Sequence, residues 1–219
     1  NEKRALNGLN LKLNEGDFVT VIGGNGAGKS TMLNAVAGTW PVDEGQILID
    51  NIDVTKLSEH KRATYLGRVF QDPMTGTAAT MGIEENLALA KRRGKSRLLR
   101  SGITKAEREE YKELLKILGL GLEDRLTSKV GLLSGGQRQA LTLLMATLQK
   151  PKLLLLDEHT AALDPKTAAK VLEITDMIVN RDHLTTLMIT HNMKDAIAHG
   201  NRLIMMMEGK ICLLYTSPS

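Results

Sequence analysis

Hydrophobic residues along the chain gather into short runs that alternate with segments of helical spacing. One run is continuous, as in a parallel strand that is buried on both faces. A looser alternation over residues 5–13 predicts an antiparallel edge strand, and residues 203–211 predict a hairpin. The other predicted strands are short, as strands usually are: 18–22, 46–50, 66–70, 152–156 (the continuous run) and 186–190.

Segments with apolar residues three and four positions apart predict helices between these strands. One helix follows a glycine-rich loop and is expected to end near Gly38, a typical C-terminal glycine. Two others are expected at 171–178 and 195–199, while residues 81–148 carry mainly helical signals. We therefore predict an α/β fold with a mainly parallel sheet, an N-terminal antiparallel β part and an inserted helical subdomain at about 81–148. All of these belong to one domain, residues 1–211.

Composition and charge narrow the class of protein. The chain has 219 residues, of which 42% are hydrophobic and 25% charged, as in ordinary globular domains. A formal net charge of +4 is too small to argue for nucleic acid by itself. The densest basic run, residues 91–97, has few aromatic residues nearby for base stacking, so we expect no nucleic-acid partner. This run is expected to be a solvated face, with anionic lipid headgroups or an acidic partner loop as the alternative.

The last residues, 212–219, do not continue the preceding pattern. They resemble a sequencing adapter translated in frame, so we expect a non-native tail on a truncated gene fragment. A natural disordered tail is the alternative. For this reason no function is assigned to Cys212 or Tyr215.

The glycine-rich loop carries the clearest chemistry. Gly23, Gly28, Lys29 and Ser30 fit the P-loop pattern G-x-x-x-x-G-K-[ST], between a predicted strand and a predicted helix. Lys29 is expected to reach the β- and γ-phosphates, and the Ser30 hydroxyl is expected to ligate Mg2+. The pattern therefore predicts a P-loop NTPase core. The expected nucleotide contacts are Gly23, Gly24, Asn25, Gly26, Ala27, Gly28, Lys29, Ser30 and Thr31.

The continuous apolar run ends in two adjacent acids, Asp157 and Glu158. In a P-loop protein we expect such a strand to lie beside the loop strand, which places Asp157 at the Mg2+. Glu158 is one residue further along the chain. It can face the attacking water as a general base.

A second anion-binding helix end is predicted where Ser134, Gly135, Gly136 and Gln137 open a helix. Ser134 suits an N-cap, and the two glycines leave backbone N–H groups free. With Leu133, these residues resemble the signature motif of ABC ATPases, and the resemblance extends over essentially the whole chain.

The resemblance implies further roles for residues of this chain. Gln71 resembles the Q-loop glutamine, which senses Mg2+ and water and faces a membrane partner. Asp164 resembles the D-loop residue at the dimer interface, and His191 resembles the switch histidine that contacts the γ-phosphate and Glu158. In this family two subunits pair head to tail, so that residues 134–137 of one subunit cap the ATP bound by the other.

The function implied is that of an ATP-binding and ATP-hydrolysing subunit, bound at the cytoplasmic face of the cell membrane to a separate permease. The subunits form a homodimer or a pair with a second ATPase. Residues 157–164 resemble those of importers for amino-acid-like solutes, which work with a solute-binding protein. The alternatives are a soluble ABC ATPase acting in DNA repair or translation and a regulatory nucleotide-binding module without turnover. The intact set Lys29, Asp157, Glu158 and His191 argues against the regulatory module.

Two features depart from the family pattern. The aromatic residue that stacks on adenine is expected upstream of Asn1, outside this sequence. His159 follows Glu158 where many family members carry proline, which alters a turn and removes no catalytic group.

Overall fold

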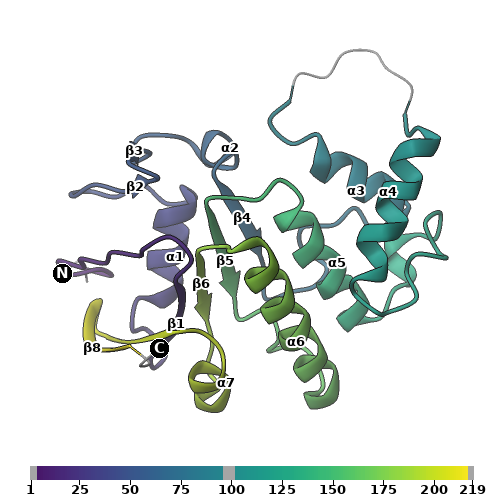
Figure 1. The fold of residues 1–219 in the computed structure, drawn as a ribbon. Helices are drawn as coiled ribbons and strands as arrows, with labels where there is room; N and C mark the ends of the chain where they lie inside the picture. Colours follow the sequence, from purple (N-terminus) through teal and green to yellow (C-terminus); the bar gives the residue numbers. More distant parts are fainter. Residues whose placement is uncertain (1–3, 96–101, 217–219) are drawn as a thin grey trace.

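A computed structural model of the chain describes residues 4–95 and 102–216 and shows a six-stranded sheet flanked by helices (Figure 1). The strand order is β4-β5-β6-β1-β7-β8. The first five of these strands run parallel, and β8 is antiparallel to β7. This sheet confirms the predicted α/β class. Its strands are β4 (Leu66–Val69), β5 (Leu153–Asp157), β6 (Thr186–Ile189), β1 (Phe18–Ile22), β7 (Arg202–Met207) and β8 (Lys210–Thr216).

Helices cover both faces of the sheet (Figure 1). Because side chains alternate along a strand, Leu155 of β5 belongs to the hydrophobic cluster under α1 (Lys29–Ala37). Its neighbours Leu154 and Leu156 belong to the cluster under α5 (Gly135–Thr147) and α6 (Pro165–Asp182). The continuous apolar run thus fills two cores at once, as the sequence predicts for a strand buried on both faces.

The chain between β4 and β5 is mainly helical. Helices α3 (Ile83–Lys91) and α4 (Lys105–Lys116) pack on each other, and a 3-10 turn, η1 (Val130–Leu132), precedes α5. Arg108 of α4 donates from Nε and Nη2 to the nearly buried Glu84 carboxylate of α3, at 2.7 and 3.1 Å. Helix α5 contacts β4 and α6 as well as α3. The assignment of 81–148 as a subdomain within one domain stays a prediction.

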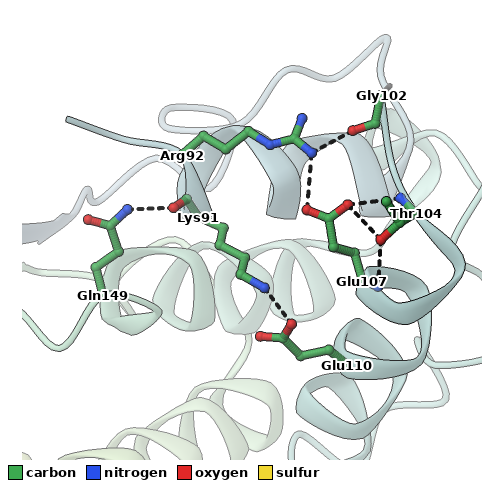
Figure 2. A network of polar contacts seen from close by, with 7 residues as sticks. All are labelled: Lys91, Arg92, Gly102, Thr104, Glu107, Glu110 and Gln149. Carbon is green, nitrogen blue, oxygen red and sulfur yellow. Dashed lines mark hydrogen bonds and ion pairs between the residues drawn. The ribbon is translucent and has the colours of Figure 1, made fainter. Parts of the chain in front are cut away.

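Two cations of the basic run 91–97 pair with acids of α4 (Figure 2). Lys91 contacts Glu110, and Arg92 Nη2 lies 3.1 Å from Glu107 Oε1. The start of the run is therefore partly neutralised within the chain, contrary to a purely solvated face. The last two residues of the run lie outside the described residues.

The strand predicted at residues 5–13 is wrong. Gly8 adopts a left-handed φ of 65°, which interrupts an extended backbone, and leucines of the segment pack on the cluster under α1 instead. The antiparallel pair of this half is formed by β2 (Leu48–Ile49) and β3 (Ile52–Asp53). Two short helices complete the described chain: α2 (Glu59–Arg62) and α7 (Met193–Ala198).

Residues 212–216 form most of β8, and their side chains are exposed. Ladder pairing with β7 accounts for their extended backbone. Their non-native origin stays a prediction, and the rest of the predicted tail lies outside the described residues.

A buried arginine fixes the end of the P-loop helix. Arg62 is 1% exposed, and its guanidinium donates to Ala35 O, Val36 O, Leu57 O and Thr55 O at 2.6 to 2.9 Å. The first two carbonyls belong to the last turn of α1, where helices leave carbonyls short of donors; Ala35 O also accepts from Gly38 N at 3.2 Å. We expect Arg62→Met to lower the free energy of unfolding by about 3 kcal/mol, because buried acceptors lose charged donors. Urea unfolding measures this loss.

The matched control is Lys61→Met, one residue earlier on the exposed face of α2. A surface change of this kind is expected to stay within about 0.5 kcal/mol of the parent chain. An equal loss in both variants would show that Arg62 does not anchor α1.

Candidate nucleotide site

The glycine-rich loop between β1 and α1 needs its glycines. Gly23 has a φ of 151°, and a Cβ there would lie 2.4 Å from Met206 O. Gly28 is the N-cap of α1 with a φ of 98°, and a Cβ there would lie 2.8 Å from Ala5 O. Larger residues would push the loop away from β7 and from the segment at Ala5. The backbone path is therefore specified by the glycines that the sequence pattern identifies.

This loop presents donors suited to an anion. The N-cap of α1 offers no side-chain acceptor, and the first helical bond runs from Met32 N to Gly28 O at 2.9 Å. The N–H groups of the first turn therefore point out of the helix end with its positive dipole. Lys29 is buried, and its Nζ donates to Gly23 O at 2.7 Å and Gly24 O at 3.2 Å. The ammonium group is thus held over the loop, and this donor set fits a phosphate chain.

Parallel strands bring most predicted site residues to one edge of the sheet. The loop follows β1, Gln71 follows β4, Asp157 ends β5 and His191 follows β6, so all four lie beyond carboxyl ends. One expectation is corrected: β5 does not lie beside β1, because β6 pairs with both of them. The strand next to the loop therefore leads to His191, and Asp157 lies one strand further away.

Glu158 and His191 form a direct contact. His191 Nε2 lies 2.6 Å from Glu158 Oε1, and the Glu158 side chain is only 12% exposed. Glu158 has a left-handed φ of 47°, uncommon for a side chain with a Cβ. Its N–H donates to Ile189 O at 3.0 Å, which fixes this turn against β6. The geometry places a carboxylate against an imidazole, a pairing that could orient and activate a water molecule.

A cavity of about 770 Å³ opens beside this pair, between α6 and α7. Glu158 and His191 line it, as do Asp176 and His199. It lies away from the loop, so it gives solvent a route to the carboxylate and does not outline the phosphate site.

Asp157 supplies an oxygen ligand suited to a hard cation. Its Oδ2 lies 3.5 Å from Arg68 Nη2. Ser30, on the first turn of α1, is exposed and offers a hydroxyl. Within residues 4–95 and 102–216 no three His, Cys, Asp or Glu side chains are grouped to hold a metal. One hydroxyl and one carboxylate fit Mg2+, which binds through one or two protein oxygens and the phosphates of a nucleotide.

The helix end at Ser134 carries a capping box. Gln137 N donates to Ser134 Oγ at 3.3 Å, and Ser134 N donates to Gln137 Oε1 at 3.2 Å. A Cβ on Gly136 would lie 2.1 Å from Thr167 Cγ2 of α6. This glycine lets the two helix starts approach closely, and Ser134 itself stays exposed.

Asp164 is the N-cap of α6. Its Oδ1 accepts from Thr167 N at 3.1 Å, and hydrogen bonds from Thr167 hold the pKa of the Asp164 carboxyl below its ordinary value. Among the described residues no hydrogen bond joins 134–137 or Asp164 to the loop 23–31. The structure therefore brings these two motifs to each other and not to the loop of their own chain.

Gln71 is exposed and makes no hydrogen bond to Asp157 or Glu158 within the described part of the chain. The backbone just before Gln71 is fixed by α5, because Gln139 donates from Nε2 to Phe70 O at 2.9 Å. The predicted metal-sensing role of Gln71 stays a prediction.

His159 is buried directly behind the site, where its Nε2 lies 3.1 Å from Thr175 Oγ1. Burial, with a smaller contribution from His199, lowers the pKa of His159 from 6.5 to about 4. Between these pH values the unfolded chain binds a proton that the folded chain does not. We expect the free energy of unfolding to fall by about 1 kcal/mol between about pH 7.5 and pH 5.5 from this group. Urea unfolding at both pH values measures this.

The control is His159→Leu, which removes the titrating ring from the same buried position. We expect its stability to vary less with pH over this range than that of the parent chain. Equal pH dependence in the two chains would assign the effect to another group.

Comparison with known proteins gives one consistent family. The family model described as ABC transporter matches residues 6–161. A tyrosine transport ATP-binding protein of Clostridioides difficile is 47% identical, over 94% of this chain and 81% of that protein. The methionine import ATP-binding protein MetN of Rhizobium etli is 36% identical, over 94% of this chain and 55% of that protein.

The fold is also found in solved structures. An ATP-binding cassette solved as a dimer in a post-hydrolysis state, bound to ADP and Pi, has a TM-score of 0.81 and 32% identity. The match covers 98% of this chain and 91% of that one. The overall fold, the phosphate-loop sequence and the relatives agree, and the chain belongs to the ABC transporter family as one of its ATP-binding domains.

Proposed function

We propose that this chain binds and hydrolyses ATP to energise solute import through a separate membrane permease. The observation that carries the proposal is the Glu158–His191 contact of 2.6 Å at the sheet edge that also carries the phosphate loop. Lys29 and the first-turn N–H groups of α1 bind the phosphates. Glu158 takes a proton from the attacking water, and His191 orients its carboxylate.

Mg2+ would be held by Ser30 and Asp157, with Gln71 reaching it from the exposed end of β4. When bound, it neutralises charge on the β- and γ-phosphates. The residues of the chain perform the other steps. It orients the phosphates through α1 and keeps the Glu158 carboxylate partly buried beside the place where water arrives.

The site is completed by a second copy of the chain or by a paired ATPase. Ser134, Gly135, Gly136 and Gln137 open a capped helix whose N-terminal end suits an anion. This end and Asp164 have no hydrogen bond to their own phosphate loop within the described residues. In a head-to-tail dimer, this helix end and Asp164 would contact the nucleotide bound by the partner. The solved cassette with ADP and Pi is itself a dimer.

Transport requires partners in the membrane. No helix among the described residues is long and apolar enough to cross a bilayer. We propose that the chain binds permease subunits at the cytoplasmic face of the membrane, with a solute-binding protein on the other side. Two relatives, at 47% and 36% identity, are named for tyrosine transport and methionine import. These names support an importer of amino-acid-like solutes over a protein of DNA repair or translation.

Reconstitution in liposomes tests this function. The chain is combined with a permease and a solute-binding protein, and ATP turnover is measured with tyrosine, methionine or spermidine. We expect an amino acid to raise turnover several-fold over the assembly without solute, and spermidine to have no effect. ATP turnover that ignores both permease and solute would contradict the transport role.

A further inference from the structure

Arg68 is a largely buried cation beside Asp157 that no motif accounts for. It lies on β4, and its Nη2 donates to Asn34 Oδ1 at 2.7 Å and lies 3.5 Å from Asp157 Oδ2. Nη1 lies 3.3 Å from Thr39 Oγ1, and the guanidinium stacks 4.6 Å from the centre of the Phe70 ring. One side chain therefore touches the P-loop helix, the acidic end of β5 and the start of the segment at Gln71.

Strand register explains this position. Arg68 pairs with Leu155 of β5, whose side chain lies in the cluster under α1. Side chains alternate along a strand, so Asp157 faces the same side as Leu155. Arg68 and Asp157 thus share the face on which α1 packs. Asn34 lies one turn after Ser30 on α1, so Arg68 reaches the helix on the face that also carries the proposed metal hydroxyl.

The charges in this region need a counterion. Asp157 and Glu158 are adjacent, and the side chains of Arg68 and Asp157 are only 14% and 19% exposed. Arg68 is the one Lys or Arg side chain within 4.0 Å of the Asp157 carboxylate in the described chain. At such low exposure a cation at this distance both stabilises the carboxylate and restricts its rotamer.

We propose that Arg68 is a positioning residue that holds Asp157 ready for the metal and acts as the internal cation with which Mg2+ competes. The inference rests on the proposed function, in which Asp157 meets magnesium. The carboxylate has two oxygens, and Arg68 contacts one of them. A divalent ion at the other would be repelled by the guanidinium, so Arg68 lowers magnesium affinity while it fixes the ligand in place.

Replacing Arg68 by an uncharged residue separates its effect on stability from its effect on magnesium affinity. We expect Arg68→Met to melt a few degrees below the parent chain without nucleotide, because Asp157 loses its counterion. At fixed ATP, we expect the magnesium concentration for half-maximal thermal protection to fall about three- to tenfold. Turnover falls as well, because the carboxylate is no longer held. An arginine with only a structural role would lower the melting temperature and leave the magnesium dependence unchanged.

Arg202→Met is the matched control. Arg202 lies on β7 and pairs with Asp17, and their side chains are 13% and 11% exposed. The variant therefore breaks a similarly buried ion pair outside the proposed site. We expect a lower melting temperature and an unchanged magnesium requirement. Arg68→Lys keeps the charge and is expected to restore most of the parent behaviour.

The experiment is a thermal-shift titration of magnesium at fixed ATP, with EDTA as the zero point. If Arg68→Met does not fold, Arg68→Gln replaces it with the same expectation. A magnesium requirement that is unchanged or higher in the variant overturns the inference. If the parent chain itself shows no magnesium-dependent protection by ATP, the proposed function fails instead, so the two failures are distinguishable.

Discussion

Glu158→Gln is expected to lower ATP turnover by about 10²–10⁴-fold, the usual contribution of a positioned general base. Glutamine keeps the size of the side chain and can still contact His191, which lies 2.6 Å from the carboxylate. It cannot take a proton from water. We expect the variant to bind ATP as the parent chain does and to accumulate as an ATP-bound dimer, because the nucleotide is no longer consumed. Phosphate release and sedimentation with ATP measure the two effects.

Glu173→Gln is the matched control, because Glu173 lines the same cavity on α6 and makes no contact with His191 in the described chain. Its turnover is expected to equal that of the parent chain. If Glu158→Gln hydrolyses ATP at the parent rate, the base is another group.

Lys29→Ala is expected to weaken ATP binding at least about 100-fold, since a charge-assisted phosphate contact is lost from a buried position. In the structure the Lys29 ammonium bonds Gly23 O and Gly24 O, at the entrance of the loop. Nucleotide binding would exchange these carbonyls for phosphate oxygens. Titration with a fluorescent ATP analogue gives the dissociation constant.

Lys170→Ala serves as the control for loss of charge. Lys170 lies on the exposed face of α6 and pairs only with Glu173 among the described residues. We expect its ATP affinity to match that of the parent chain. Tight ATP binding by Lys29→Ala would show that the loop is not the phosphate site.

The sequence predicts the strands of the core well, because local and tertiary signals agree there. Residues 153–156 are all leucine, and β5 is buried on both faces. Residues 5–13 show the limit of the approach. Their leucines alternate as in a strand, but whether such a segment pairs depends on a free neighbouring edge and on Gly8, whose φ of 65° bends the chain.

Motifs in the sequence predict the residues of the candidate site only in part. Glycine spacing identifies the loop, and the strand-end acids identify Asp157 and Glu158. The contact between Glu158 and His191 depends on the pairing of β5 with β6, which sequence spacing does not specify. The sequence does not identify Arg68, because nothing in its own segment marks it. Its role arises only when β4 is placed beside β5 and α1 is packed over both.

Mixing two inactive variants tests most directly the central claim that the nucleotide lies between the loop of one copy and the Ser134 helix end of the other. Lys29→Ala removes the loop contact, and Ser134→Glu places a carboxylate where it repels phosphate but suits a helix start. Each variant alone is expected to be inactive. In a mixed dimer one site carries both defects and the other carries none, so equal mixing should restore about a quarter of parent turnover. Mixtures that stay as inactive as the separate variants would contradict a shared site.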